Sequence, residues 1–187
     1  TALTGMTTTG AVDASLVSNL TGSVEEIEAA QTNTAITLAG NYAATISAGT
    51  EAATALTGMT TVGAVDASLV STLTGSVEEI EAAQTSTAIT LADDYAAIIS
   101  AGTETASALT GMTTVGAVDA SAVTLITSVD TEIGKDASVV VAALGLTGAG
   151  TTVAATITGS AISVANTNLI AGATSGIVTA SVSETTA

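Results

Sequence analysis

The sequence predicts an α/β repeat protein, a solenoid in which short parallel strands alternate with short helices. Three observations support this fold class. The hexapeptide Gly-Ala-Val-Asp-Ala-Ser begins at Gly10, Gly63 and Gly116, so its copies are 53 residues apart. The first two 53-residue intervals differ at seven positions, which leaves 46 identical residues. Within each interval, short β-branched runs alternate with helix-start signals, and duplicated units of this kind bury each other's apolar faces.

The repeat divides the chain into four parts. We expect a first copy at residues 1–53, a second at 54–106, a divergent partial third copy at 107–150, and Gly/Thr-rich coils at 151–187. Each full copy is expected to hold two coils, because known α/β solenoids use about 20–29 residues per coil. The last part is expected to be more β-like. Because the first copy keeps the consensus, we expect a processed product or a segment of a longer repetitive protein.

The first half of the second copy combines a strand with two short helices. Residues 62–67 are β-branched and small, as expected of a strand. In residues 69–75 the apolar side chains follow helical spacing up to Gly75, which predicts a short helix. Ser76 and Glu79 then form a capping box that opens a helix over residues 77–84.

The second half of this copy repeats the scheme. Residues 88–92 are expected to form a strand. Asp93 or Asp94 can cap a helix over residues 95–100, and Thr103 can cap another over residues 104–110, with Gly111 at its end.

After the third hexapeptide the pattern has a different length. Helix starts are expected at Thr127 or Ser128 and at Asp136, the second helix covering residues 137–144. Strand composition recurs at residues 152–158 and 176–182. Residues 160–171 fit a helix and a strand equally well by periodicity.

The strands are expected to stack in one parallel ladder with an aliphatic interior. Five β-branched residues begin successive coils and are predicted to occupy equivalent inward positions: Val12, Ile36, Val65, Ile89 and Val118. An aspartate in place of Ile89 is therefore expected to be strongly destabilising.

Composition limits the function. The chain has one basic residue, Lys135, and seventeen acidic residues, for a formal charge of −16. This balance excludes binding of nucleic acid through phosphate neutralisation. The longest apolar run, residues 139–146, is too short for a membrane span. A 47% share of hydrophobic residues argues for an ordered chain. The absence of Cys is compatible with an extracellular protein that uses no disulfides.

The hexapeptide aspartates are candidate metal ligands. Asp13, Asp66 and Asp119 recur at one position of the predicted ladder, and aligned carboxylates are the ligands that Ca²⁺ prefers. The alternative is that each Asp or Ser caps the following helix or stabilises an exposed turn, and this alternative is favoured. No cofactor is required by the sequence, and calcium is the one candidate ion.

Glutamates gather at the predicted helix starts. Glu25, Glu26 and Glu28 recur as Glu78, Glu79 and Glu81. Paired carboxylates can serve catalysis, but acidic residues in a first helical turn complement the helix dipole and are expected to be solvated. With no His, Cys or Arg, near-identical copies offer little from which to build a catalytic pocket, so we expect a protein that is not an enzyme. An ice-binding face is disfavoured because Thr does not recur in a regular Thr-x-Thr ladder.

Three motifs carry a resemblance to a known class of proteins. They are Val65-Asp66-Ala67-Ser68 followed by Leu73-Thr74-Gly75, the run of residues 88–94, and Gly176-Ile177-Val178-Thr179-Ala180-Ser181. These resemble repeats of giant tandem-repeat extracellular and cell-surface proteins of marine bacteria, including cyanobacteria. The resemblance covers most of the chain and implies an adhesin, surface-fibre or cell-coat role outside the cell. It brings no catalytic residues.

The sequence therefore predicts a structural extracellular or cell-surface repeat protein that forms a fibre, a coat or an adhesive stalk. Its expected partner is another copy of itself, in head-to-tail or lateral assembly, or the continuation of a longer chain. Neither nucleic acid nor membrane insertion is expected. The alternative is a binding module that displays a site for calcium, a glycan or an ice surface on the repeat ladder.

Overall fold

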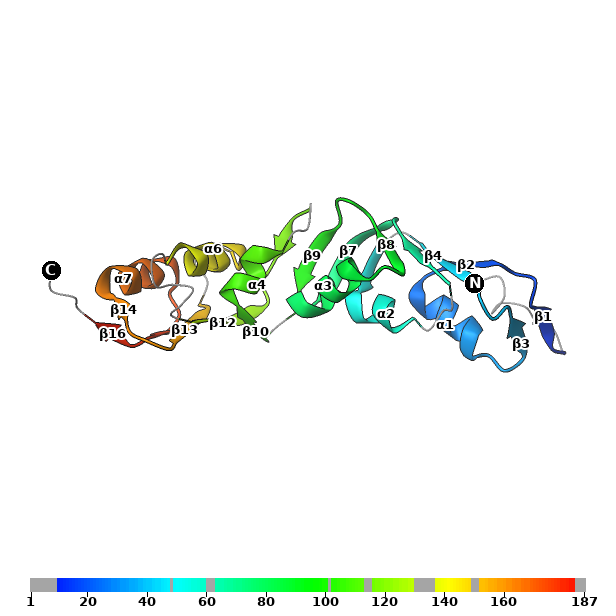
Figure 1. The fold of residues 1–187 in the computed structure, drawn as a ribbon, viewed down its shortest axis with the longest axis horizontal. Helices are drawn as coiled ribbons and strands as arrows, with labels where there is room; N and C mark the ends of the chain where they lie inside the picture. The colour runs from blue at the N-terminus through cyan, green and yellow to red at the C-terminus, as the bar shows by residue number, and fades with distance from the viewer. Residues whose placement is uncertain are drawn as a thin grey trace. The chain divides into compact units, whose positions relative to one another are not determined.

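The computed structural model describes residues 10–47, 49–59, 63–100, 102–112, 116–129, 137–148 and 152–183. It is an α/β structure in which strands of two to seven residues alternate with short helices (Figure 1). The described strand pairings are parallel. The predicted fold class is therefore confirmed as an α/β arrangement of short parallel strands and helices.

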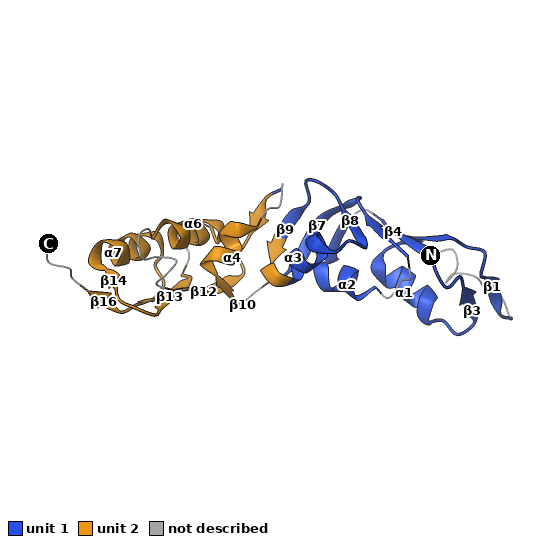
Figure 2. Cartoon of the chain, viewed as in Figure 1, with its two compact units in different colours: residues 1–75, 79–97, 114–116 blue, residues 76–78, 98–113, 117–187 orange. Residues whose placement is uncertain are grey.

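The chain forms two compact units (Figure 2). Unit 1 comprises residues 1–75, 79–97 and 114–116, and unit 2 comprises residues 76–78, 98–113 and 117–187. Two elements contribute residues to both units, namely α3 (Val77–Thr85) and β9 (Ala96–Ile99).

Unit 1 is built from parallel strand pairs. β1 pairs with β3, β5 pairs with β7, and β2, β4, β6 and β8 form one sheet in that order. The strands are β1 (Val12–Ala14), β2 (Asn19–Gly22), β3 (Ile36–Leu38), β4 (Ala43–Ile46), β5 (Gly49–Ala52), β6 (Val65–Ala67), β7 (Val70–Gly75) and β8 (Ile89–Leu91). The helices that lie wholly in this unit are α1 (Val24–Thr32) and α2 (Ala53–Gly58).

Two pairings in unit 1 cross the boundary between the first and second sequence copies. β4 of the first copy pairs with β6 of the second, and the Ala44 amide donates to the Ala64 carbonyl at 3.0 Å. β5 pairs with β7 in the same way, with Gly49 beside Val70. Backbone hydrogen bonds therefore join the copies, in addition to the covalent chain.

Unit 2 contains the remaining elements. β10, β12, β13 and β15 form one parallel sheet, and β14 pairs with β16. The strands are β10 (Gly102–Thr105), β11 (Val118–Asp119), β12 (Val123–Val129), β13 (Ala154–Thr158), β14 (Ile162–Ser163), β15 (Val178–Thr179) and β16 (Val182–Ser183). The helices are α4 (Ala106–Gly111), α6 (Ser138–Leu146) and α7 (Val164–Ala173).

The β5–β7 junction recurs in unit 2. β10 pairs with β12 so that Gly102 lies beside Val123, 53 residues after the equivalent pair in unit 1. Even the side-chain contacts are repeated, because the Ser71 hydroxyl donates to the Gly49 carbonyl at 3.2 Å and the Thr124 hydroxyl donates to the Gly102 carbonyl at 3.3 Å. The junction is thus a property of the repeat.

An aliphatic core follows from alternation along the strands. Leu20, Ala44 and Val65 are neighbours in register across the four-stranded sheet, and all three are buried. The residues that alternate with them are exposed or half-buried, and most are polar: Asn19, Thr21, Ala43, Thr45 and Asp66. Because the side chains of successive residues point to opposite faces of a sheet, this pattern leaves one apolar and one polar face.

The capping signals predict the longer helices well. α3 occupies residues 77–85, one residue beyond the predicted end. In its first-copy equivalent, α1, the Ser23 side chain accepts from the Glu26 amide and the Glu26 side chain accepts from the Ser23 amide, which completes the capping box. α4 also forms, but it begins at Ala106 with Thr105 as its N-cap, so the predicted cap at Thr103 is wrong.

The short helix predicted at residues 69–75 is wrong, because these residues form β7. The pairing with β5 contains an irregularity that leaves Ser71 without a register partner. A bulge of this kind turns Val70 and Leu73 toward the same side although they are three residues apart, and both are fully buried. The bulged strand therefore imitates helical spacing in the sequence.

Two further helix predictions are also wrong. Residues 96–99 form β9, in which Ala97 and Ile99 are buried and Ile98 is exposed, so the period is that of a strand. Thr127 and Ser128 lie within β12 and start no helix. The helix predicted after Asp136 is confirmed as α6, which extends through Gly145 to Leu146. Asp136 itself lies outside the described residues.

The expectation of a more β-like C-terminal part is wrong for residues 164–173. These residues form α7, whose N-cap Ser163 accepts from the Asn166 amide. That cap resolves the ambiguous segment in favour of a helix. The strand predicted at residues 152–158 is confirmed as β13, and the one at 176–182 is divided between β15 and β16.

The C-terminal part repeats the first copy more closely than the sequence comparison indicated. Residues 154–157 have the same sequence as β4, and both strands pair onward in the same register, with Ala155 beside Val178 and Ala44 beside Val65. A side chain at Gly63 has no room, since its Cβ would lie 2.6 Å from the Tyr42 carbonyl oxygen, and Gly176 meets a backbone carbonyl in the same way. Residues 176–181 are therefore a fourth, divergent hexapeptide.

The predicted single ladder is only partly right. Val12 pairs with Ile36 and Val65 pairs with Ile89, as expected, but the two pairs belong to different sheets. Val118 lies in β11 of unit 2. Ile89 is half-buried rather than enclosed, so an aspartate there is expected to cost less than the sequence suggested.

Candidate functional surface

The hexapeptide aspartates stabilise exposed turns. The Ser15 amide donates to Asp13 Oδ1 at 3.0 Å, the Ser68 amide to Asp66 at 3.0 Å, and the Ser121 amide to Asp119 at 2.9 Å. All three carboxylates are exposed. Hydrogen bonds from the serine side chain and then from its amide lower the pKa of each aspartate. This is the exposed-turn role that was favoured over metal binding.

The structure does not align Asp13 with Asp66. Asp13 lies in the two-stranded sheet beside Thr37, whereas Asp66 lies in the four-stranded sheet between Thr45 and Thr90. Asp119 is in β11 of unit 2. Among the residues that the structure describes, no group of three or more His, Cys, Asp or Glu side chains is placed to hold a metal ion.

Instead, the outward positions form polar rows that cross the strands. In parallel sheets, neighbouring strands are about 4.8 Å apart, so residues in register form a regular line. The row in unit 1 is Thr21, Thr45, Asp66 and Thr90. The row in unit 2 is Thr105, Thr127, Thr156 and Thr179.

These rows are a surface feature that the sequence analysis did not identify. A Thr-x-Thr pattern lies along one strand, whereas these threonines recur across strands that are neighbours in register. The available signal was the presence of Thr at matching positions of successive strands. Asn19 extends the unit 1 row toward the strand end, since its side-chain amide donates to the Thr45 hydroxyl at 3.0 Å. The outer face of the sheets is therefore a hydroxyl-rich surface with isolated carboxylates.

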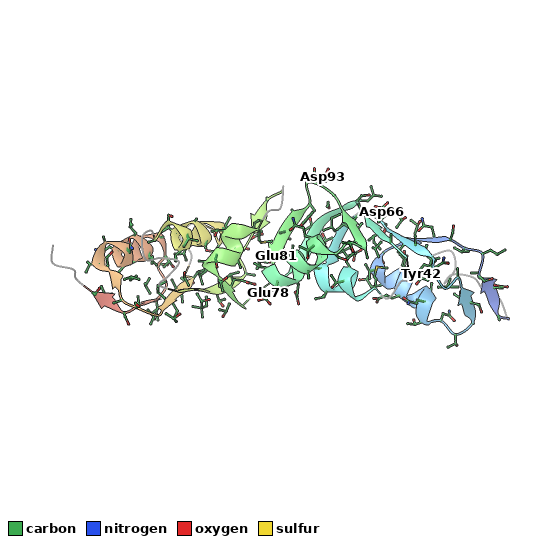
Figure 3. All side chains as sticks on the ribbon, in the orientation of Figure 1. Tyr42, Asp66, Glu78, Glu81 and Asp93 are labelled. Carbon is green, nitrogen blue, oxygen red and sulfur yellow. The ribbon has the colours of Figure 1, made fainter. Side chains whose placement is uncertain are left out.

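The glutamates at the helix starts are largely solvated, as predicted. Glu25, Glu28, Glu78 and Glu81 are exposed, whereas Glu26 and Glu79 are half-buried. The pKa of Glu25 is lowered, first by a hydrogen bond from its own amide and then by the Ser23 side chain. In unit 1, Asp66 and Asp93 lie along one margin of the view in Figure 3. Among the described residues, these carboxylates do not gather into a group of three that could hold a metal ion.

Glu51 is a buried carboxylate that the sequence analysis did not single out. Only 8% of its surface is exposed, and it accepts a hydrogen bond from the Val24 amide at the start of α1. Burial first, and then the nearby Glu25 charge, raise the pKa of Glu51. In the second copy the Val77 amide donates to Glu104 at 3.3 Å, so α3 receives the same cap from the following coil.

Two buried hydroxyls also recur. Tyr42 and Tyr95 are each 4% exposed, and neither hydroxyl has a hydrogen-bond partner among the described residues. Burial raises the pKa of both. At the corresponding point of unit 2, Gly176 meets the backbone of Val153, which is buried and has no polar atom in its side chain.

Comparison with known proteins identifies no relative. No family model, no curated protein and no solved structure matches the chain. Within the described part of the chain, none of the helices has the length and apolar character needed to cross a bilayer.

Proposed function

We propose that this chain is a structural segment of an extracellular or cell-surface repeat protein that builds a fibre, a coat or an adhesive stalk. In this proposal the chain is a solenoid with two coils in each 53-residue copy. The observation that carries it is the pairing of β4 with β6 and of β5 with β7, because these pairs join one copy to the next. Copies joined in this way make a continuous element instead of separate beads.

The chemistry of the chain supports a role without catalysis. The sequence has no His, Cys or Arg, and several of its carboxylates stabilise turns or cap helices. A net charge of −16 keeps such an element soluble and repels other anionic surfaces. The resemblance of the hexapeptide segments to bacterial surface repeats supports a location outside the cell.

The second candidate is a binding module, and the polar rows favour it. A line of Thr hydroxyls with about 4.8 Å spacing presents a regular set of donors and acceptors. The candidate ligands of such a module are calcium, a glycan and an ice surface. Of these, the hydroxyl row suits a polyhydroxylated glycan or ordered water better than calcium, since it supplies few charged oxygens.

Electron microscopy of the purified chain tests the scaffold role. We expect rods or filaments with a regular axial repeat, whether as single chains or as assemblies. Compact particles with no axial repeat would contradict the proposal. Thermal melting in millimolar calcium, with a chelator and a matched monovalent salt as controls, tests the binding alternative. Stabilisation by calcium alone supports specific sites, and an equal response to both salts supports general screening of the acidic surface.

A further inference from the structure

The edge of β15 that faces away from β13 has no described strand beside it, and exposed apolar side chains lie on β15's neighbouring segments in unit 2. Among the described residues, β15 pairs with β13 only. Ile177, next to β15, is 76% exposed, and Val182 of β16 is 48% exposed. Leu169 of α7 is 58% exposed as well. Such an edge is a template for another strand.

β1 in unit 1 has the complementary edge. Its one described partner is β3, with Val12 beside Ile36 and Asp13 beside Thr37. The opposite edge of β1 carries no described strand. Along β1, Asp13 is exposed and Ala14 is buried, so the strand has the alternation of the inner strands.

β6 shows what a strand of this sequence accepts on its two sides, because β1 and β6 share the sequence Val-Asp-Ala. On one side of β6, Thr45 lies beside Asp66, and on the other side Thr90 does. The aspartate therefore has a threonine as its neighbour in both directions. An apolar residue, Ala44 or Ile89, lies beside Val65 in the same strands.

β15 presents this same pattern at the edge that no described strand covers. Val178 is half-buried and continues the apolar row from Ala155, while Thr179 is exposed and continues the hydroxyl row from Thr156. β15 thus offers β1 the apolar residue and the threonine that β6 receives from its neighbours. No carboxylate of this edge would oppose Asp13, and like charges directly opposite each other are destabilising.

We propose that β15 of one chain pairs in parallel with β1 of a second copy, with Val178 beside Val12 and Thr179 beside Asp13. This inference rests on the proposed scaffold function and gives it a specific self-association surface. The two edges differ, so the contact is heterologous and continues from copy to copy as an open filament. A second copy is the occupant because the chain itself supplies both matching edges.

The test uses the 187-residue chain and the variant Thr179→Asp, which sets a carboxylate opposite Asp13. Sedimentation velocity over a concentration series measures the dissociation constant. We expect the wild-type chain to associate and Thr179→Asp to raise the dissociation constant about fivefold or more. The double variant Thr179→Asp with Asp13→Thr restores the Asp–Thr pair and is expected to recover association. Circular dichroism verifies that each variant is folded.

The matched control is Ser160→Asp, which adds the same charge at an exposed bend of unit 2. Equal weakening by Thr179→Asp and Ser160→Asp would overturn the proposed pairing, since it would reflect net charge alone. A monomeric wild-type chain at the highest concentration would overturn it too. Rods that appear in the microscope but never associate would leave the scaffold function standing and refute only this contact.

Discussion

The helices α1 and α6 begin in opposite ways. At the start of α1, Ser23 and Glu26 form a capping box, and the buried Glu51 accepts from the Val24 amide. At the start of α6, the N-cap residue is Ala137, which makes no side-chain hydrogen bond. Three polar side chains thus act at the start of α1, whereas the N-cap residue of α6 has no side-chain acceptor.

The residue that corresponds to Glu51 is also apolar in the region of α6. Aligning residues 43–46 with residues 154–157 places Ile162 where Glu51 stands, and Ile162 is 3% exposed. Both β5 and β14 pair with the following strand at this position. The position is buried in both regions, but its side chain is charged in one region and apolar in the other. In the first region a buried carboxylate accompanies a capping serine, and in the aligned region an aliphatic side chain accompanies an alanine N-cap.

The largest expected effect comes from placing the polar residue in the apolar region. Ile162→Glu buries a carboxylate in a coil that has lost the serine cap, and should lower the free energy of unfolding by roughly 3 kcal/mol or more. Urea unfolding followed by circular dichroism measures this. The control is Leu69→Glu at an exposed site, where a change within about 0.5 kcal/mol is expected. Equal losses at both sites would show that burial is not the cause.

Removing the carboxylate from the polar region should have a smaller effect. Glu51→Ala leaves the Val24 amide without its partner and is expected to cost about 1–2 kcal/mol. The matched control is Glu28→Ala, which removes an exposed charge from the same helix. If the two variants have the same unfolding midpoint, the buried cap contributes nothing to stability.

The capping serine should contribute less again. Ser23→Ala is expected to lower the free energy of unfolding by about 1 kcal/mol. The reciprocal change Ala137→Ser is expected to raise it by a smaller amount, because it adds a capping hydroxyl to α6. Urea unfolding of both variants measures the two changes. No gain in stability from Ala137→Ser would contradict the inference that the alanine leaves this N-cap position without a side-chain acceptor.

The smallest effect is a pH dependence that belongs to Glu51. Its pKa is raised in the folded state, so the folded chain binds this proton more tightly than the unfolded chain does. The charged form therefore costs stability at neutral pH, and the cost is relieved as pH falls through the folded pKa toward 4.5. Glu51→Gln should remove this acid-side gain. Melting temperatures of both chains between neutral pH and 4.5 test it, and parallel curves would refute it.

The turn aspartates should act in the opposite direction. Their lowered pKa values mean that any stability they contribute is present above about 4 and is lost as pH falls through the folded pKa. Because these carboxylates are exposed, their contribution is screened by solvent and is small.

Local signals predicted local structure. The Ser76 capping box located α3 to within one residue because its atoms are all within one helical turn. Val70 and Leu73 were misread because a bulge gave a strand the spacing of a helix. Glu51 had no local signature at all, since its partner amide at Val24 is 27 residues away and only the tertiary fold brings the two together.

The turn aspartates and the threonine rows also differ in how far apart in sequence their residues lie. The Asp13 turn was predictable because Asp and Ser are two residues apart. The hydroxyl row through Thr127 and Thr156 depends on strand register, and the separation of these residues differs from the 53-residue period. The sequence therefore indicated which residues cap and turn, whereas the pairing of strands decided which residues line up.

Hydrogen exchange at the Ala44 amide tests directly whether strand pairing joins the first two copies. This amide donates to Ala64 across the boundary between the first two copies, while the Ala43 amide donates to Ser18 within the first copy and the Val65 amide to Ala88 within the second. We expect NMR-detected exchange of the Ala44 amide to be as slow as that of the Ala43 and Val65 amides, because β4 and β6 pair as closely as strands within one copy. An Ala44 amide that exchanges at the rate of an unstructured linker, beside protected Ala43 and Val65 amides, would contradict it.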